Sequence, residues 1–119
     1  MTVKCLDAEV LARIRRQRSE AFLAGLIDLF LEESPGRIRE AWAGGKSRDR
    51  RKTAVAAHIL GCLADNIGAL AVRDLALAAE AACAGRDGTA ADLSRILYDI
   101  EIAFAETRAC LISARAGAP

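Results

Sequence analysis

The stretch RKTAVAAHILGCLAD, residues 51–65, has the spacing of an amphipathic helix and carries His58, the only histidine of the chain. At about 100° per residue, the face opposite the imidazole is formed by apolar residues, namely Ala56, Leu60, Leu63 and Ala64. The histidine's own side holds mostly small or charged residues, namely Arg51, Ala54, Val55, Gly61, Cys62 and Asp65. This pattern predicts a helix that buries its leucines and leaves the ring of His58 open to solvent.

The rest of the chain shows the same helical periodicity. Alanine and leucine are abundant and only two prolines occur, which favours helix over strand. The cap and turn signals predict six helices. The first three are a helix capped by Asp7, one over Glu20 to Glu33, and one after Ser34-Pro35 that ends at Gly44-Gly45. The other three are one from Ser47 to Asp65-Asn66, one over Ala69 to Ala84, and one after Thr89 and Asp92. Such helices bury their apolar stripes most simply as an all-α, antiparallel four-helix bundle with one or two short accessory N-terminal helices.

Length and composition fit one globular domain over residues 1–119. Hydrophobic residues make up 53% of the chain and charged residues 28%, which excludes a disordered chain. We expect the bundle core over about residues 20–112, an accessory helix within 1–19 and a frayed tail over 113–119.

Several functional classes find no support in the sequence. A net charge of +1 gives no overall attraction to nucleic acid or to an anionic membrane. No apolar run of about 18 residues and no secretory signal pattern occur, so we expect a cytoplasmic protein without a membrane span. Phosphate-binding glycine motifs are absent, and the four cysteines do not have metal-ligand spacing, so neither an ATP site nor a metal site is predicted.

The chemistry that remains centres on the imidazole. A Cys-His nucleophile pair is conceivable because Cys62 lies four residues after His58, but an exposed helix face offers neither a shaped pocket nor an oxyanion hole. A neutral imidazole is a competent nucleophile near pH 7. Phosphoryl transfer depends mainly on positioning and charge stabilisation, both of which a partner's active site can supply.

Two segments at fixed spacing resemble a known motif. Ala57-His58-Ile59-Leu60, followed by Asn66-Ile67-Gly68-Ala69 and later by Leu75 and Glu80, resembles the motif A-H-x-L-K-G-S-x-x-N-x-G-A of histidine-containing phosphotransfer (HPt) domains. The resemblance extends over about residues 20–112. It implies a four-helix bundle whose exposed His58 accepts a phosphoryl group from the aspartate of a response-regulator receiver domain and passes it to a second receiver in a phosphorelay.

The resemblance also implies the partners and cofactors. Receiver domains, alone or as part of a hybrid sensor histidine kinase, would dock around the histidine on Ala54, Val55, Ile59, Gly61, Cys62 and Asp65. Mg²⁺ would belong to the receiver, so the chain would be a phosphoryl carrier without a cofactor of its own and not an enzyme. We expect it to act as a monomer.

The sequence departs from the motif directly after the histidine. Where the family has Lys-Gly, this chain has Gly61-Cys62, which removes a candidate positive charge for the phosphoryl oxygens. Arg51, two turns earlier on nearly the same face, is a candidate replacement.

Other interpretations stay open at this point. The same bundle could dock and regulate a receiver or sensor kinase without being phosphorylated, and His58 could be a satisfied core histidine. The apolar edge of Val55, Ile59 and Cys62 fits packing against a neighbouring helix as well as docking of a receiver. A structural protein that self-associates through Val55 and Ile59 is a further alternative.

Overall fold

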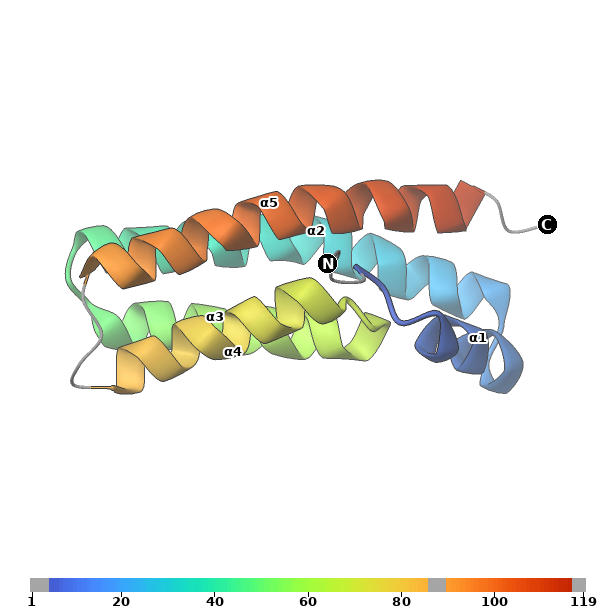
Figure 1. The fold of residues 1–119 in the computed structure, drawn as a ribbon. Helices are drawn as coiled ribbons and strands as arrows, with labels where there is room; N and C mark the ends of the chain where they lie inside the picture. The colour runs from blue at the N-terminus through green and yellow to red at the C-terminus, as the bar shows by residue number, and fades with distance from the viewer. Residues whose placement is uncertain (1–4, 86–89, 117–119) are drawn as a thin grey trace.

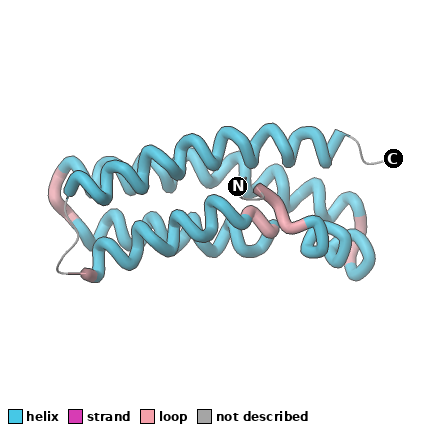
Figure 2. Tube along the Cα trace, in the orientation of Figure 1, coloured by secondary structure: helices cyan, strands magenta, loops and turns pink. Residues whose placement is uncertain are grey.

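The computed structural model describes residues 5–85 and 90–116, and helices make up most of this part of the chain (Figures 1 and 2). The helices are α1 (Ala8–Gln17), α2 (Glu20–Lys46), α3 (Arg50–Ile67), α4 (Leu70–Ala84) and α5 (Ala90–Ala116). Helices α2 to α5 run antiparallel to one another in sequence order, and each packs against two of the others, α2 and α4 both lying against α3 and α5. The predicted all-α bundle of four long helices with one short N-terminal helix is confirmed.

Unequal helix lengths determine where α1 lies. Helices α2 and α5 have 27 residues each, whereas α3 has 18 and α4 has 15. At about 1.5 Å per residue, α2 and α5 therefore extend more than 10 Å beyond α3 and α4. Helix α1 packs on α2 beside the ends of α3 and α4, with Leu11 buried (Figure 1). As predicted, Asp7 caps α1, its side chain accepting a hydrogen bond from the backbone of Glu9 at 3.0 Å.

The core changes character from one side of the bundle to the other. Large side chains fill the side of α2 and α5, where the rings of Phe30 and Phe104 lie 5.6 Å apart. Helices α3 and α4 bury mainly small side chains, including Ala64 and Ala76, both fully buried. Small side chains allow two helix backbones to approach closely. The close approach of α3 and α4 positions the residues of the candidate site.

Helix α2 is continuous, so the helix break predicted at Ser34-Pro35 is wrong. Pro35 lies inside the helix and Ser34 is fully buried rather than acting as an N-cap. A proline inside a helix removes one backbone hydrogen bond and typically costs about 3 kcal/mol. The buried positions Phe30, Ser34, Ile38 and Ala41 keep helical spacing across the proline, so burial of this face outweighs the cost.

The start of α3 was also predicted wrongly. Ser47 ends α2 instead of beginning α3, and its hydroxyl donates a hydrogen bond to the carbonyl oxygen of Ala43 at 2.9 Å. The N-cap of α3 is Asp49, whose carboxylate accepts a hydrogen bond from the backbone of Lys52 at 3.1 Å. Between them Arg48 has a φ of 57°, and the reversal of the chain lies about two residues later than predicted.

Helix α5 extends further toward the C-terminus than predicted. Helix α5 continues through residues 113–116, which were expected to fray. Leu111 is fully buried one turn earlier, and Arg115 forms an ion pair with Asp28 of α2 at 3.1 Å, so the last turn stays packed on the bundle. Thr89, predicted as the cap of this helix, lies outside the described residues.

The connection between α3 and α4 is a tight turn tied to the N-terminal segment. Gly68 has a φ of 71°, the left-handed conformation expected for a glycine that ends a helix. The backbone N–H of Asp7 donates to the carbonyl oxygen of Gly68 at 2.8 Å, and that of Leu70 donates to Cys5 at 3.0 Å. A Cβ at position 68 would also lie 2.9 Å from the Cβ of Val10. The turn therefore requires glycine for its backbone conformation and for space.

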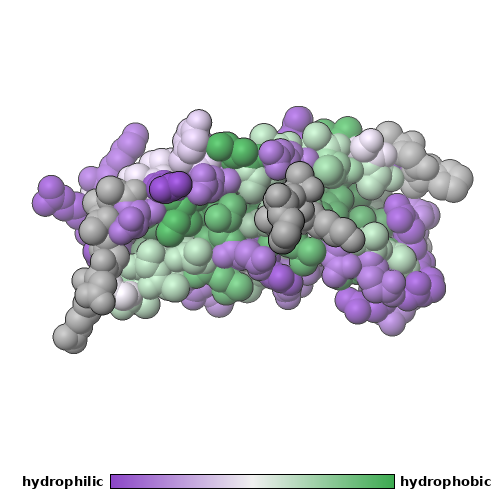
Figure 3. Space-filling model, in the orientation of Figure 1, coloured by the Kyte–Doolittle hydropathy of each residue, from purple (hydrophilic) through white to green (hydrophobic). Residues whose placement is uncertain are grey.

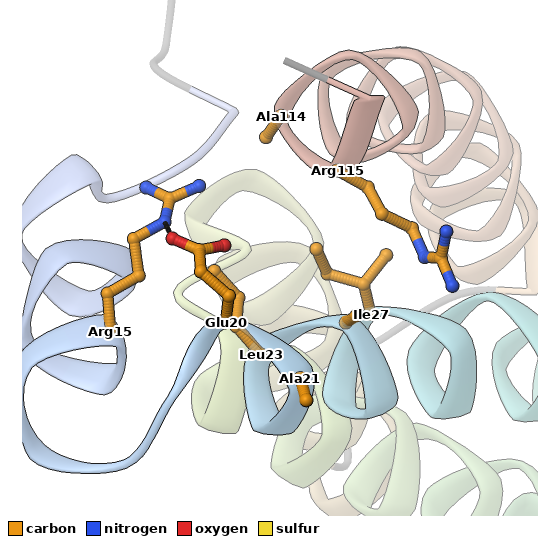
Figure 4. A pocket seen from close by; sticks show the side chains of 8 residues that line it. Arg15, Glu20, Ala21, Leu23, Ile27, Ala114 and Arg115 are labelled. Atoms are coloured by element: carbon orange, nitrogen blue, oxygen red, sulfur yellow. Dashed lines mark ion pairs between the residues drawn. The ribbon is translucent and has the colours of Figure 1, made fainter. Parts of the chain in front are cut away.

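A cavity of about 250 Å³ lies where α1, the start of α2 and the end of α5 meet (Figure 4). Its floor includes the buried side chains of Leu23 and Ile27. Arg15 and Arg115 stand on opposite sides of it, and Arg15 forms an ion pair with Glu20 at 2.8 Å. This cavity shares no lining residue with the cavity beside His58 described below.

The surface seen in Figure 3 is hydrophilic over α1 and apolar along the middle of the face formed by α4 and α5. Across residues 5–85 and 90–116, none of the helices combines the length and apolar character that crossing a bilayer requires.

The junction of α2 and α3 gives a stability prediction with an internal control. A Cβ on Gly44 would lie 2.7 Å from the backbone nitrogen of Thr53 and would overlap its hydroxyl oxygen, which donates a buried hydrogen bond to Ala41 at 2.9 Å. Gly44→Ala should therefore lower the free energy of unfolding by about 1–3 kcal/mol in chemical denaturation.

The control is Gly45→Ala, whose Cβ would meet only the Cδ1 of Leu97 at 3.9 Å. This variant should be neutral or more stable by up to about 1 kcal/mol, because alanine favours helix over glycine. Equal losses in the two variants would contradict the steric argument.

Candidate functional site

Helix α3 holds His58 on the outside of the bundle. The helix buries Ala56, Leu60 and Ala64 at its core face, each at most 1% exposed, whereas the side chain of His58 is 64% exposed. The prediction that the ring projects into solvent is confirmed. The alternative of a core histidine is wrong, since the helical periodicity directs the leucine inward and the ring outward.

Glu80 of α4 contacts the ring at Nδ1. Both carboxylate oxygens lie 3.2 Å from Nδ1 of His58. An ionised carboxylate can only accept a hydrogen bond, so the hydrogen-bond donor must be the N–H group at Nδ1. A neutral ring in this arrangement therefore carries its lone pair on Nε2, which is the nitrogen available for nucleophilic attack.

Cys62 lies on the other side of the ring. Its Sγ is 3.7 Å from Nε2 of His58, a contact that the spacing of four residues allowed. Glu80 and Cys62 thus flank the ring, one at each nitrogen. Cys62 is itself exposed, so the region around Nε2 remains open to a partner.

A cavity of about 280 Å³ extends from the ring along the groove between α3 and α4. Helix α3 contributes His58, Gly61, Cys62 and Asp65 to its lining, and α4 contributes Arg73, Leu77 and Glu80. The cavity brings together the predicted residues Gly61, Cys62 and Asp65. The three residues from α4 were not predicted as site residues, although Glu80 belonged to the motif resemblance.

A signal that could have found the α4 residues is the symmetry of the α3–α4 turn. In two antiparallel helices, residues equally distant from the turn lie opposite each other. His58 and Glu80 each lie eleven residues from Ala69, and Asp65 and Arg73 each lie four residues from it. Both pairs are in contact, the second through an ion pair at 3.6 Å.

The other predicted residues lie outside this cavity. Ala54 is half-buried, and of the predicted apolar edge Val55 is 52% exposed, Cys62 is exposed and Ile59 is half-buried, so most of the edge faces solvent. Arg51 lies in the first turns of α3 and is exposed. The suggested role of Arg51 in stabilising a phosphoryl group stays a prediction.

Arg73 is the cation of the cavity. It forms ion pairs with Asp74 at 3.0 Å and with Asp65 at 3.6 Å. The hydrogen bond to Asp74 is the main cause that raises the pKa of Arg73 above its ordinary value; desolvation opposes this rise, and the negative charges of Asp74 and Asp65 add to it. Arg73 therefore remains charged under all physiological conditions.

Over the described ranges 5–85 and 90–116, no three side chains of His, Cys, Asp or Glu converge in a way that could hold a metal ion.

The helical arrangement is that of an HPt-like bundle. The structure is similar to the crystal structure of histidine-containing phosphotransfer protein B (HptB) from Pseudomonas aeruginosa PAO1, with a TM-score of 0.86 and 22% sequence identity over 99% of this chain and 100% of that chain. By sequence, the chain matches no model of a known protein family and no curated protein.

The contact between His58 and Glu80 predicts the tautomer of the neutral ring. In the wild type, ¹⁵N NMR should show Nδ1 protonated and Nε2 unprotonated, because the carboxylate accepts from Nδ1. Glu80→Ala should shift the population away from this tautomer, whereas Cys62→Ala, at the other nitrogen, should retain it. With one histidine in the chain, a single pair of resonances reports the result. A tautomer unchanged in Glu80→Ala would show that the carboxylate does not set it.

Proposed function

We propose that this chain is a histidine phosphotransfer protein that carries a phosphoryl group between receiver-domain aspartates of a phosphorelay through His58. The observation that carries the proposal is the exposure of this imidazole, 64% for the side chain, on an HPt-like bundle with Glu80 bound to the nitrogen that is not attacked. The motif around His58 and Gly68 supports the same assignment.

The transfer step follows from the orientation of the ring. The lone pair of Nε2 attacks the phosphorus of a receiver's phosphoaspartate, so that the N–P bond forms while the bond between phosphorus and the aspartate oxygen breaks. The aspartate leaves as a carboxylate and the ring becomes a cation that still holds the proton on Nδ1. Glu80, 3.2 Å from Nδ1, stabilises this positive charge. The reverse sequence returns the group to a second receiver.

The surface beside the ring suits a docking partner. Val55 on α3 and Leu77 on α4 are exposed by 52% and 55%, Val55 lying further from the α3–α4 turn than His58 and Leu77 nearer to it. Exposed apolar side chains around a polar centre are typical of protein–protein contacts. In this proposal the receiver supplies the Mg²⁺ and the acidic pocket, and the chain works as a cytoplasmic monomer without an ATP site.

The central prediction concerns label transfer. A receiver domain loaded with ³²P-phosphate, mixed with this chain in the presence of Mg²⁺, should transfer label to it within seconds to minutes. The label should be acid-labile, as expected for a phosphoramidate bond. His58→Gln should reduce incorporation at least about 100-fold, because glutamine offers no nucleophilic nitrogen.

The same experiment separates the proposal from a regulatory binding module of the same fold. Binding of a receiver by wild type and by His58→Gln alike, with no label on either, would favour the module. Label that persists in His58→Gln would place the acceptor elsewhere and contradict the assignment of His58.

Docking can be tested apart from transfer. Val55→Glu should weaken receiver binding at least about tenfold in calorimetric titration, since it places a charge within the apolar contact. The matched control is Ile102→Glu on α5, which is 45% exposed and lies on a helix that contributes no residue to the cavity beside His58. Equal weakening by the two variants would argue against a docking surface at Val55. If Val55→Glu instead changed the sedimentation of the free chain, self-association would be favoured.

A further inference from the structure

We infer that Arg73 of α4 binds the phosphoryl group on His58, and that Arg73 forms an ion pair with Asp65 while the histidine is unmodified. The inference rests on the proposed phosphorylation of His58 and adds to it a specific phosphoryl-binding residue. Arg73 would supply the positive charge for the phosphoryl oxygens that is missing at Gly61, the position where HPt domains have lysine.

The direction of the phosphoryl group follows from the two contacts of the ring. Glu80 occupies the side of Nδ1, whereas Nε2 faces Cys62 at 3.7 Å, one turn further along α3. A phosphoryl group on Nε2 therefore projects away from the carboxylate of Glu80 and along the groove toward Asp65 and Arg73. The same cavity contains all of these side chains.

The distance to be covered is compatible with the side chains involved. His58 and Asp65 are separated by two helical turns, roughly 10 Å along the axis. Arg73 lies opposite Asp65 and contacts it at 3.6 Å, so its guanidinium lies at the far end of the cavity. A phosphorylated imidazole and an arginine that extend toward each other from the two ends can meet over this separation. Gly61, on the path between them, has no side chain that would obstruct the contact.

The charges of the cavity single out Arg73. The charged or titratable side chains in its lining are His58, Asp65, Arg73, Glu80 and the thiol of Cys62. A phosphoryl dianion is repelled by the two carboxylates, and Arg73 is the cation within this lining. Arg51, the candidate from the sequence, is not part of the lining.

The present partners of Arg73 allow an exchange. Its contact with Asp74 is short, 3.0 Å, and that with Asp65 is longer, 3.6 Å, to a carboxylate whose side chain is 66% exposed. Such an exposed ion pair contributes little to stability. A phosphoryl group with three acceptor oxygens and nearly two charges is a stronger partner for guanidinium. Arg73 can therefore leave Asp65 for the phosphoryl group while Asp74 keeps its side chain in place.

The test uses the chain alone, phosphorylated on His58 with phosphoramidate, and follows the ³¹P resonance as a function of pH. A nearby cation favours the dianion and lowers the pKa of the phosphoryl group. Arg73→Gln should therefore raise the titration midpoint by at least about half a pH unit, a threefold change in proton affinity. Asp65→Asn, which releases Arg73 from its competitor and removes a negative charge, should lower it. A purely structural role of Arg73 would not move this midpoint.

Arg51→Gln is the matched control and should leave the midpoint unchanged. A midpoint that moves in Arg51→Gln but not in Arg73→Gln would assign the role to Arg51 and overturn the inference. Unchanged midpoints in both Arg73→Gln and Asp65→Asn would also overturn the inference. The proposed function would still stand in that case, because the wild type would have taken up a phosphoryl group on His58. If the wild type took up no phosphoryl group on His58, the proposed function would fail, and the inference with it.

Discussion

The close packing of α3 against α4 is the constraint on which the candidate site depends. The two helices bury small side chains such as Ala64 and Ala76, and a Cβ on Gly61 would lie only 3.5 Å from that of Ala76. Because the backbones approach so closely, a side chain on the outer face of α3 can reach one on α4. The contact of His58 with Glu80 is a product of this approach, and so is the narrow groove that continues from the ring.

Two chemically different ends characterise that groove. Near the ring, Glu80 holds the proton on Nδ1 and can balance a positive charge on the imidazole. At the far end, Arg73 is shared between two aspartates. The unmodified groove therefore has an excess of negative charge at the ring and a cation that is already paired. Such a surface favours a partner that brings positive charge to the ring.

The sequence predicted what depends on one helix and missed much of what depends on two. Periodicity was sufficient to place His58 in solvent, because the leucine two positions later has to be buried. The left-handed turn at Gly68 was also predictable from glycine alone. The continuation of α2 through Pro35 was not, since tertiary burial outweighed a strong local breaker. Arg73 and Leu77 were missed for a related reason: a single helix does not reveal which residues another helix brings to it.

The turn between α3 and α4 has a consequence for the whole site. Only Gly68 and Ala69 separate the two helices, and hydrogen bonds to the N-terminal segment fix both sides of this connection. Such a short link has no slack with which to absorb an added residue. One extra residue would rotate the following helix by about 100° and move it about 1.5 Å along its axis, carrying Glu80 away from the imidazole. The number of residues in this connection, as much as the identity of any side chain, keeps the carboxylate of Glu80 in contact with the imidazole of His58.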